Sequence, residues 1–398
     1  MRRTLIIVGA VVVILGIGFA VYFFFFKPSV TSVPGGTLPV AGPGGGVGTG
    51  TGSGGTPSNT PITVTPRLVQ ISKGPVVPGE IVLNARAVNA SSTPDTAVQY
   101  IERQSGNIYS YSVGAKTLTR ISNKTIPGIQ SASWLPTGAI AYVQYLSGEN
   151  SSTINTYALS ATSTDGFFLS QDLAAVAASP SSASPSVLTL ASGASGSVAS
   201  LLNTNGTHAV PVFSSPLSAI QVAYAGKQYL AYTKPSGGLL GNAYLVDTFG
   251  NFSRLAGPEY GLSALASPSG GWVLVSFVQN TVMKMVLVNT ATNETLTLPL
   301  STLAEKCVWA TDDSVIYCGV PVDPPLGATY PDDWYQGAVQ FSDRLWKIQV
   351  IGRYAQLVLD FSQEAKSSLD AIALAIDPNT TTLVFVNKND GSLWSYSL

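Results

Sequence analysis

The chain has 398 residues, of which 10% are charged, and its formal net charge is −1. An average soluble protein has about 25% charged residues, and proteins that bind nucleic acids cluster their Lys and Arg. The 20 Lys and Arg residues here are scattered, so we expect no nucleic-acid partner. Two cysteines and one histidine are too few for a tetrahedral zinc site of the usual kind, and we predict no metal and no cofactor.

The N-terminal segment is apolar. Residues 5–26, LIIVGAVVVILGIGFAVYFFFF, carry no charge. A helix of this length spans about 33 Å, enough to cross a hydrocarbon core of about 30 Å. We predict an uncleaved signal anchor at residues 1–27, with Arg2 and Arg3 holding the N-terminus in the cytoplasm and the rest of the chain outside it, at the cell surface or in the periplasm. A cleaved signal peptide is the alternative, although its apolar region is usually shorter.

Residues 28–66 contain no charge and consist mostly of Gly, Thr, Pro and Ser. Such a composition buries too little apolar surface to order the chain, which predicts a flexible linker. The stretch GTGSGG matches the dinucleotide pattern GxGxxG. It has neither a strand before it nor a helix after it, so we attribute the match to chance.

Residues 67–398 repeat a short pattern of strand, turn and strand, with hardly any helical periodicity. A further pair of strands precedes each of these hairpins, as in NIYSYSVGAKTLTRI and RLWKIQVIGRYAQLVL. Four strands with a period of about 40 residues are the signature of propeller blades. The hairpins occupy residues 131–145, 173–191, 218–233, 263–277, 306–320 and 370–387.

The two ends of this region match each other. GSLWSYSL, the last eight residues, nearly repeats GNIYSYSV at residues 106–113. We therefore expect GSLWSYSL to be the first strand of a blade whose remaining strands come from the N-terminal part of the domain, because a split blade closes the ring without open edges. The count is then seven blades in an all-β propeller, with six and eight as alternatives.

The strand-turn-strand SWLPTGAIAYV and the preceding IYSYSV resemble the propeller repeats of the TolB-like and WD40-like superfamily. The Trp-Asp ending of true WD40 blades is missing. The overall layout, with RLVQISKGPV, YIERQSGNIYSYS, TRISNKTIPGI, CVWATDDSVIYCGVP and YPDDWYQGAVQFSDRLWKI, resembles membrane-anchored propeller proteins of candidate-phyla bacteria. That resemblance implies an envelope location and carries no established activity.

Cys307 and Cys318 flank the predicted hairpin at residues 306–320. With the turn between Asp312 and Asp313, the two cysteines face each other across the strands, within reach of a disulfide. An even number of cysteines outside the cytoplasm suits this prediction. Two buried free thiols are the alternative, and either role is structural.

No catalytic motif is apparent in the sequence. The one histidine, His208, follows a turn and enters a strand, where we expect a surface residue, and there is no GxSxG nucleophile motif. We therefore predict that the chain is not an enzyme. A pair of channel carboxylates for glycoside chemistry stays open, because blades bring distant Asp and Glu residues together. Asp332 and Asp333 are also weighed as a Ca²⁺ site, although adjacent carboxylates usually point apart.

Residues 320–343, VPVDPPLGATYPDDWYQGAVQFSD, break the repeat between the fifth and sixth predicted units. Long irregular segments in compact domains are often functional, and aromatic residues beside polar groups are typical of recognition surfaces. This excursion either plugs the central channel with buried aromatics or presents them to a partner, and the two roles are compatible. Its candidate residues are Tyr330, Asp332, Asp333, Trp334, Tyr335 and Phe341.

Taken together, these features predict a membrane-anchored, extracytoplasmic β-propeller that acts as a non-catalytic interaction or scaffold module of the cell envelope. We expect a protein or a surface glycan as its partner. The alternative from another class is a surface carbohydrate-active or hydrolytic enzyme with a carboxylate pair in the channel. Two carboxylates about 5–10 Å apart in the channel would favour that enzyme.

Overall fold

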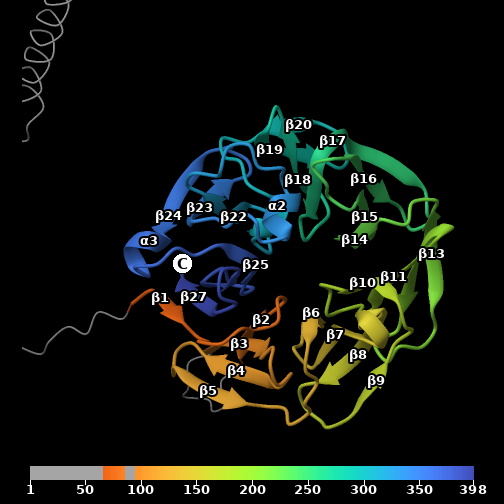
Figure 1. Cartoon of the computed structure of the whole chain (residues 1–398), viewed down its shortest axis with the longest axis vertical. Helices are drawn as coiled ribbons and strands as arrows, with labels where there is room; N and C mark the ends of the chain where they lie inside the picture. The colour runs from red at the N-terminus through yellow and green to blue at the C-terminus, as the bar shows by residue number, and fades with distance from the viewer. Residues whose placement is uncertain (1–65, 86–94) are drawn as a thin grey trace, which may run out of the picture. The chain divides into compact units, whose positions relative to one another are not determined.

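The computed structural model describes residues 66–85 and 95–398 (Figure 1). These residues form 27 strands and two short α-helices, α2 (Asp332–Tyr335) and α3 (Phe361–Glu364), which confirms the all-β prediction. The predicted membrane helix at 1–27 lies outside the described residues, as does the linker at 28–66 except for its last residue. In the part of the chain that is described, no helix is long and apolar enough to cross a membrane.

The strands form antiparallel sheets, five with four strands and one with seven. Two of the four-stranded sheets consist of β2 (Ile81–Ala85), β3 (Asp95–Ile101), β4 (Ile108–Ser112) and β5 (Thr117–Arg120), and of β6 (Ile129–Trp134), β7 (Ile140–Ser147), β8 (Thr153–Ser160) and β9 (Gly166–Phe168). Two more consist of β10 (Leu173–Ala178), β11 (Val187–Gly193), β12 (Gly196–Leu202) and β13 (Val210–Ser215), and of β21 (Cys307–Trp309), β22 (Val315–Pro321), β23 (Asp343–Gln349) and β24 (Ala355–Asp360).

The seven-stranded sheet results from one long strand, β17 (Phe252–Ala266). Its first half pairs with β16, and its second half pairs with β18. Register shifts on both sides let the strand turn from the outer edge of one group of four strands to the inner edge of the next. The other strands of this sheet are β14 (Ile220–Ala225), β15 (Gln228–Thr233), β16 (Leu240–Val246), β18 (Trp272–Gln279), β19 (Val282–Asn289) and β20 (Thr295–Thr297).

The remaining four-stranded sheet joins the two ends of the domain. Its strands are β25 (Ala371–Ile376), β26 (Thr382–Asn387), β27 (Leu393–Ser397) and, from the N-terminal side, β1 (Leu68–Gln70). The predicted split is therefore present, but the division of strands was wrong. GSLWSYSL contains the third strand of this sheet, β27, and the N-terminal side adds only β1. The matching octet GNIYSYSV contains β4, which is also a third strand, so the likeness reflects equivalent positions.

The predicted hairpins are present, but their grouping into units was shifted by two strands. Each hairpin opens a sheet instead of closing one, because its second strand pairs with the strand that follows, as β7 does with β8. The predicted and the observed grouping place the same strands next to each other along the chain. The sequence repeat alone therefore does not show where one sheet ends and the next begins. The excursion accordingly lies inside one sheet, between β22 and β23.

The sheets follow one another around a central axis, and β2, β6, β10, β14 and β25 lie nearest that axis (Figure 1). Apolar side chains fill the space between neighbouring sheets. Leu188 and Phe213 pack against Val222 and Tyr229 of the next sheet, for example. Face-to-face packing of this kind buries one side of each strand against its neighbour and gives every sheet two covered faces.

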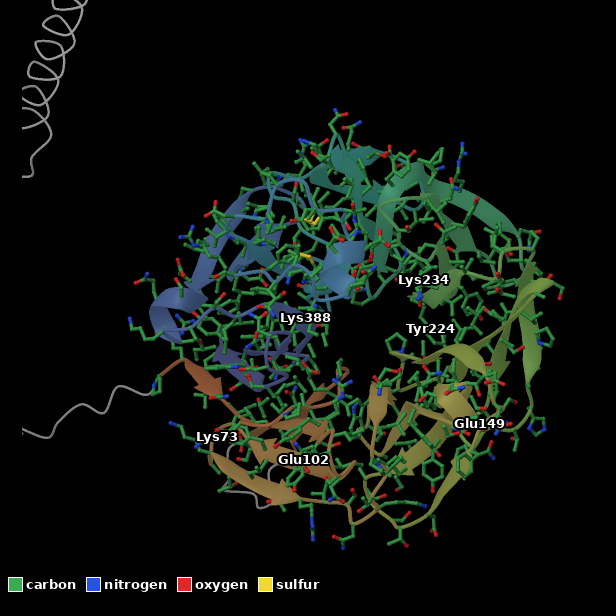
Figure 2. The ribbon with its side chains drawn as sticks, viewed as in Figure 1. Lys73, Glu102, Glu149, Tyr224, Lys234 and Lys388 are labelled. Carbon is green, nitrogen blue, oxygen red and sulfur yellow. A yellow bond between two sulfur atoms is a disulfide. The ribbon has the colours of Figure 1, made fainter. Side chains whose placement is uncertain are left out.

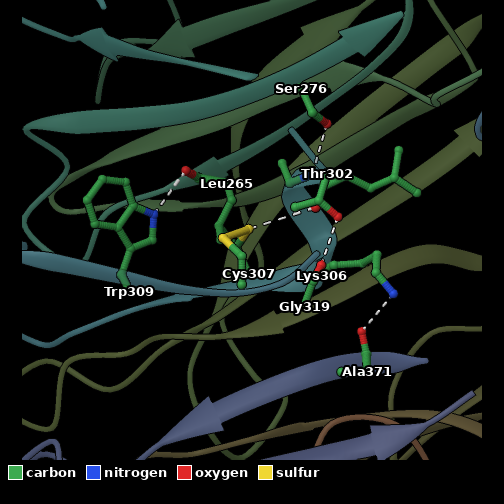
Figure 3. The surroundings of a disulfide bond; sticks show 11 residues. Leu265, Ser276, Thr302, Lys306, Cys307, Trp309, Gly319 and Ala371 are labelled. Atoms are coloured by element: carbon green, nitrogen blue, oxygen red, sulfur yellow. Dashed lines mark hydrogen bonds between the residues drawn. A yellow bond between two sulfur atoms is a disulfide. The ribbon is translucent and has the colours of Figure 1, made fainter. Parts of the chain in front are cut away.

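The structure contains the disulfide predicted between Cys307 and Cys318. The two residues are direct partners in the β21–β22 register, and their Cα atoms are 4.1 Å apart. Figure 3 shows the bond beside Trp309, whose indole N–H donates to the carbonyl of Leu265 at 3.3 Å. The bond therefore fastens the inner strand of this sheet close to its contact with the preceding sheet.

A buried carboxyl group lies where the segment just before β2 approaches the inner strand β6. Gly79 has a φ of 102°, and a Cβ at this position would lie 2.0 Å from the carbonyl oxygen of Ala132. The next residue, Glu80, is buried, and its Oε1 has no hydrogen-bond partner among the described residues. Burial raises the pKa of Glu80 to about 8, against the opposing effect of backbone N–H groups.

Removing residues 391–398 from the full chain should destabilise the domain strongly. The deletion takes away β27, which pairs with both β26 and β1, and removes the buried side chains of Leu393 and Tyr396. We expect the melting temperature to fall by at least about 10 °C. Removing Leu398 alone is the control and should shift it by only a few degrees. If the truncated chain melts within about 2 °C of the intact one, the loss of stability is negligible. That result would show that the split sheet does not close the ring.

Replacing Glu80 with Gln should change how stability depends on pH. Between the ordinary pKa of Glu and about 8, the unfolded chain loses this proton while the folded chain keeps it, so folding stability falls as pH rises. Glu80→Gln removes this loss. As the pH rises from about 5 to 8, the free energy of unfolding of the variant should increase relative to that of the wild type by on the order of a few kcal/mol. Denaturant unfolding of both proteins at about pH 5 and pH 8 measures the difference in folding stability between the variant and the wild type. If that difference is the same at both pH values, Glu80 is not a buried, protonated carboxyl group.

Candidate functional site

A cavity of about 470 Å³ lies on the inner side of the ring. Its walls come from β14, from the loop after β15, from the 3₁₀-helix η3 (Ala304–Lys306) and from α2. Figure 2 shows one of its residues, Lys234, on the side of the ring that faces the centre. Of its seven lining residues one is Pro235, and the other six have polar side chains: Gln221, Lys234, Glu305, Asp332, Tyr335 and Gln336.

The excursion provides one wall of this cavity and folds on a small core of its own. Trp334 is 2% exposed and stacks on Phe341, with ring centroids 5.8 Å apart. Tyr330 is buried in the same cluster, together with Leu303 and Met283. Tyr335, by contrast, is 39% exposed. The helix α2 therefore turns Trp334 into the protein and presents Tyr335 to the cavity.

A buried ammonium group fixes the position of the excursion. The Nζ atom of Lys306 lies 2.8 Å from Oδ2 of Asp343, contacts Oδ1 of Asp370, and donates to the carbonyl of Ala371 at 3.1 Å. All three charged side chains are fully buried. Figure 3 shows Lys306 reaching from η3 toward Ala371 in β25. The group thus connects the end of the excursion to the split sheet.

Asp370 links the same group to the aromatic cluster. Its Oδ2 accepts hydrogen bonds from the indole N–H of Trp334 at 2.8 Å and from the backbone N–H of Phe341 at 3.2 Å. The ammonium of Lys306 also lies over the rings of Trp334 and Phe341, 5.1 and 5.2 Å from their centroids. Cation–π contacts of this kind are strongest where water is excluded.

Glu305 precedes Lys306 and lines the cavity. The hydroxyl of Tyr335 donates a hydrogen bond to its Oε1. Glu305 is exposed as a residue, and its carboxyl group lies at the cavity wall. Partial desolvation by the neighbouring protein groups raises the pKa of Glu305, opposed by the Tyr335 hydrogen bond and by the charges of Lys306 and Lys388. Desolvation and the Glu305 charge also raise the pKa of Tyr335, so the hydroxyl remains a donor.

The two adjacent aspartates of the excursion have different partners. Oδ2 of Asp332 accepts hydrogen bonds from the backbone N–H of Gly237 and the hydroxyl of Ser236. Oδ2 of Asp333 accepts the backbone N–H of Thr329 at 2.7 Å. The pair does not converge on one point, and among the described residues no group of three or more His, Cys, Asp or Glu side chains is placed to hold a metal ion.

A second cavity, of about 340 Å³, has an apolar lining from five inner strands. Its residues include Ala178, Tyr224, Leu265, Trp309 and Leu374. Figure 2 shows Tyr224 directed toward the centre of the ring. These residues lie in the later parts of the inner strands, whereas Gln221 and Glu305 of the polar cavity lie at or before the starts. The inner side of the ring is therefore polar toward one face and apolar toward the other.

The structure brings only some of the predicted residues to the cavity. Asp332 and Tyr335 line it, whereas Tyr330, Trp334 and Phe341 form the core behind it and Asp333 bonds within the excursion. His208 lies on the turn between β12 and β13, exposed, with Asn203 and Thr207 as its hydrogen-bond partners. The burial of Trp334 is the packing that a plug requires, and the role of the excursion stays a prediction.

Sequence reasoning missed Glu305, Lys234, Gln221 and Gln336. A signal for Glu305 was present, because it comes directly before an inner strand in a chain with few charged residues. The starts of the inner strands meet near the axis, so a charged residue at such a start faces the same space as residues from other sheets. Lys234 offers a weaker signal of the same kind, since it follows the second strand of its hairpin.

No family model matches this sequence, and no curated protein matches it. Solved structures do match its fold. Oligogalacturonate lyase from Vibrio parahaemolyticus aligns over 83% of this chain and 93% of its own, with a TM-score of 0.56 and 8% identity. The β-propeller domain of the trilobed protease from Pyrococcus furiosus aligns over 81% and 93%, with a TM-score of 0.51 and 7% identity. A chain of the mitotic checkpoint complex aligns over 84% and 95%, with a TM-score of 0.51 and 10% identity.

These likenesses establish the fold, and the described domain is a β-propeller, as the repeats predicted. They contradict the prediction that the chain is not an enzyme, because enzymes such as oligogalacturonate lyase share this fold. That prediction depended on the absence of recognisable motifs in the sequence. In a propeller the site is assembled from separate sheets, so a missing local motif does not exclude catalysis. The resemblance to propellers of candidate-phyla bacteria stays a prediction.

Replacing Trp334 with Ala should cost about 3–5 kcal/mol of folding stability, because it leaves a cavity in a packed cluster and removes one of the two hydrogen bonds to the buried Oδ2 of Asp370. The control is Phe249→Ala, since Phe249 is 88% exposed. We expect this change to stay within about 0.5 kcal/mol. Denaturant unfolding of the full chain measures both. Equal, small losses in the two variants would show that Trp334 is not a core residue.

Proposed function

We propose that this chain is a membrane-anchored, extracytoplasmic propeller of seven blades that binds a hydroxyl-rich ligand of the glycan class in the polar cavity. The count of seven treats the seven-stranded sheet as two blades that share β17 and the split sheet as one. The apolar run at residues 5–26 supports the anchor. The disulfide supports a location outside the cytoplasm.

The observation that carries the proposal is the chemistry of the cavity lining. The amides of Gln221 and Gln336 donate and accept hydrogen bonds, the ammonium of Lys234 donates, and the carboxyl groups of Glu305 and Asp332 accept. Sugar hydroxyls also donate and accept, and several adjacent hydroxyls need such a mixed set around them. The volume of about 470 Å³ falls in the range of small-molecule sites.

Other features favour this cavity over the apolar one. The apolar cavity offers few partners for hydroxyl groups. A purely anionic ligand would meet two carboxyl groups beside Lys234, which disfavours it. The propeller of oligogalacturonate lyase belongs to a protein named for an oligosaccharide, which supports the use of this fold for such ligands. The excursion then has both predicted roles, with its buried side as a plug and its exposed side as a binding wall.

Binding is tested with the full chain in detergent micelles on an array of neutral, N-acetylated and acidic oligosaccharides, followed by calorimetry with those that bind. Gln336→Ala and Lys234→Ala should each weaken binding by roughly tenfold or more, because each removes hydrogen bonds to the ligand. The matched controls are Gln356→Ala on β24 and Lys227→Ala on the β14–β15 turn, which are exposed and outside the cavity.

Two results contradict the proposal. One is the absence of binding to every oligosaccharide on the array. The other is equal weakening by cavity variants and control variants, which would place the binding surface elsewhere on the ring. Circular dichroism of each variant confirms that the loss is not a loss of folding.

A further inference from the structure

We infer that the polar cavity also hydrolyses a glycosidic bond of its ligand, with Glu305 as the general acid and Asp332 as the carboxylate that activates water. This inference rests on the proposed glycan binding and adds a reaction to it. Both residues line the same cavity, so both are within reach of one bound ligand.

Tyr335 connects the two residues within the cavity wall. Asp332 and Tyr335 are three residues apart on α2 and therefore on one face of the helix turn, with Cβ atoms about 5–6 Å apart. The hydroxyl of Tyr335 donates a hydrogen bond to Glu305, so this tyrosine contacts one carboxyl group and shares a helix turn with the other. The charge of Asp332 also contributes to the raised pKa of Tyr335, which requires that the two groups be near each other. Activation of water by one carboxylate requires the two carboxyl groups to be about 6.5–9.5 Å apart, which leaves room for the water molecule between Asp332 and the sugar.

The surroundings of Glu305 suit an acid. Its Oε1 accepts the hydroxyl of Tyr335, which leaves Oε2 for the proton. The groups that act on it are Tyr335 from α2, Tyr232 from β15, Lys306 beside it in η3, and Lys388 from the split sheet. Desolvation outweighs the two lysines and raises the pKa of Glu305, which favours the protonated form compared with an ordinary Glu.

The surroundings of Asp332 are different. One oxygen, Oδ2, is held by the backbone N–H of Gly237 and the hydroxyl of Ser236. These contacts fix the orientation of the side chain between α2 and the loop after β15. Oδ1 has no hydrogen-bond partner in the described part of the chain, and Asp332 borders the cavity. A water molecule between Oδ1 and the ligand can therefore lose a proton to this oxygen.

The reaction consumes one water molecule. Asp332 takes a proton from water as the water oxygen forms a bond to the anomeric carbon of the sugar. The bond between that carbon and the bridging oxygen breaks, and Glu305 gives its proton to the bridging oxygen. The products are two sugars with free hydroxyl groups. Glu305 has lost one proton and Asp332 has gained one, and exchange with solvent restores both.

The test uses the full chain and those glycans that bind it, each prepared as an aryl glycoside with a 4-nitrophenyl leaving group and with an unsubstituted phenyl leaving group. Glu305→Gln should lower kcat/KM on the phenyl glycoside by about 10²-fold or more, because that leaving group needs a proton. The loss on the 4-nitrophenyl glycoside should be much smaller. Asp332→Asn should lower both, since water activation serves both substrates.

The matched controls are Glu294→Gln and Asp165→Asn, at exposed positions outside the cavity. They should leave both rates unchanged. Glu305→Gln should still bind the unmodified glycan within about threefold of the wild type, a change of well under 1.4 kcal/mol. A purely structural role for Glu305 would lower both rates equally and weaken binding as well.

The outcomes separate the two proposals. Binding without hydrolysis of any bound glycoside by the wild-type chain overturns this inference and leaves the proposed function standing. Failure to bind any glycan overturns both. Hydrolysis in which Glu305→Gln affects both leaving groups equally overturns the assignment of Glu305 as the acid.

Discussion

The buried ammonium group of Lys306 is the interaction on which the arrangement of the site depends. It meets two carboxylates, Asp343 and Asp370, in a region without solvent. Burying three charges costs several kcal/mol per ion unless each is paired and hydrogen-bonded, and loss of one partner would leave an uncompensated charge. The backbone of Ala371 adds two hydrogen bonds to these charges. Its N–H donates to Asp343, and its carbonyl oxygen accepts from Lys306. Three segments distant in sequence are thereby held in one geometry.

The candidate site follows from this geometry. Asp370 accepts the indole N–H of Trp334, and Trp334 fixes the turn of α2 that carries Asp332 and Tyr335. Tyr335 in turn bonds to Glu305, the residue next to Lys306. The same 3₁₀ turn therefore supports the excursion with one side chain and faces the cavity with the next. A site held on both sides by packed elements keeps its side chains in place without help from a ligand.

The sequence predicted the hairpins and the facing cysteines because both depend on neighbours close in the chain. It did not predict how the hairpins group into sheets, since the pairing of β7 with β8 resembles the pairing within each hairpin. The continuous strand β17 was not predicted as one strand, because only its end lies in a predicted hairpin, at residues 263–277. Glu305 and Asp332 were not paired in advance, because only the ring brings η3, the excursion and β14 to one cavity. A prediction from local patterns reaches the strands, whereas the site depends on the closure of the ring.

Charged residues are concentrated around the candidate site. In a chain with 10% charged residues, Lys234, Glu305, Asp332 and the Lys306 group lie around one small region on the inner side of the ring. Apolar residues would line that space at a lower desolvation cost, as they do around the apolar cavity. The paired charges of the Lys306 group are explained by the support that they give to the excursion. Glu305 also contacts the excursion, since it accepts a hydrogen bond from Tyr335, but it lies at the wall of the cavity and not in the buried group. A carboxyl group with a raised pKa at a cavity wall is placed to interact with a ligand as well as with the fold.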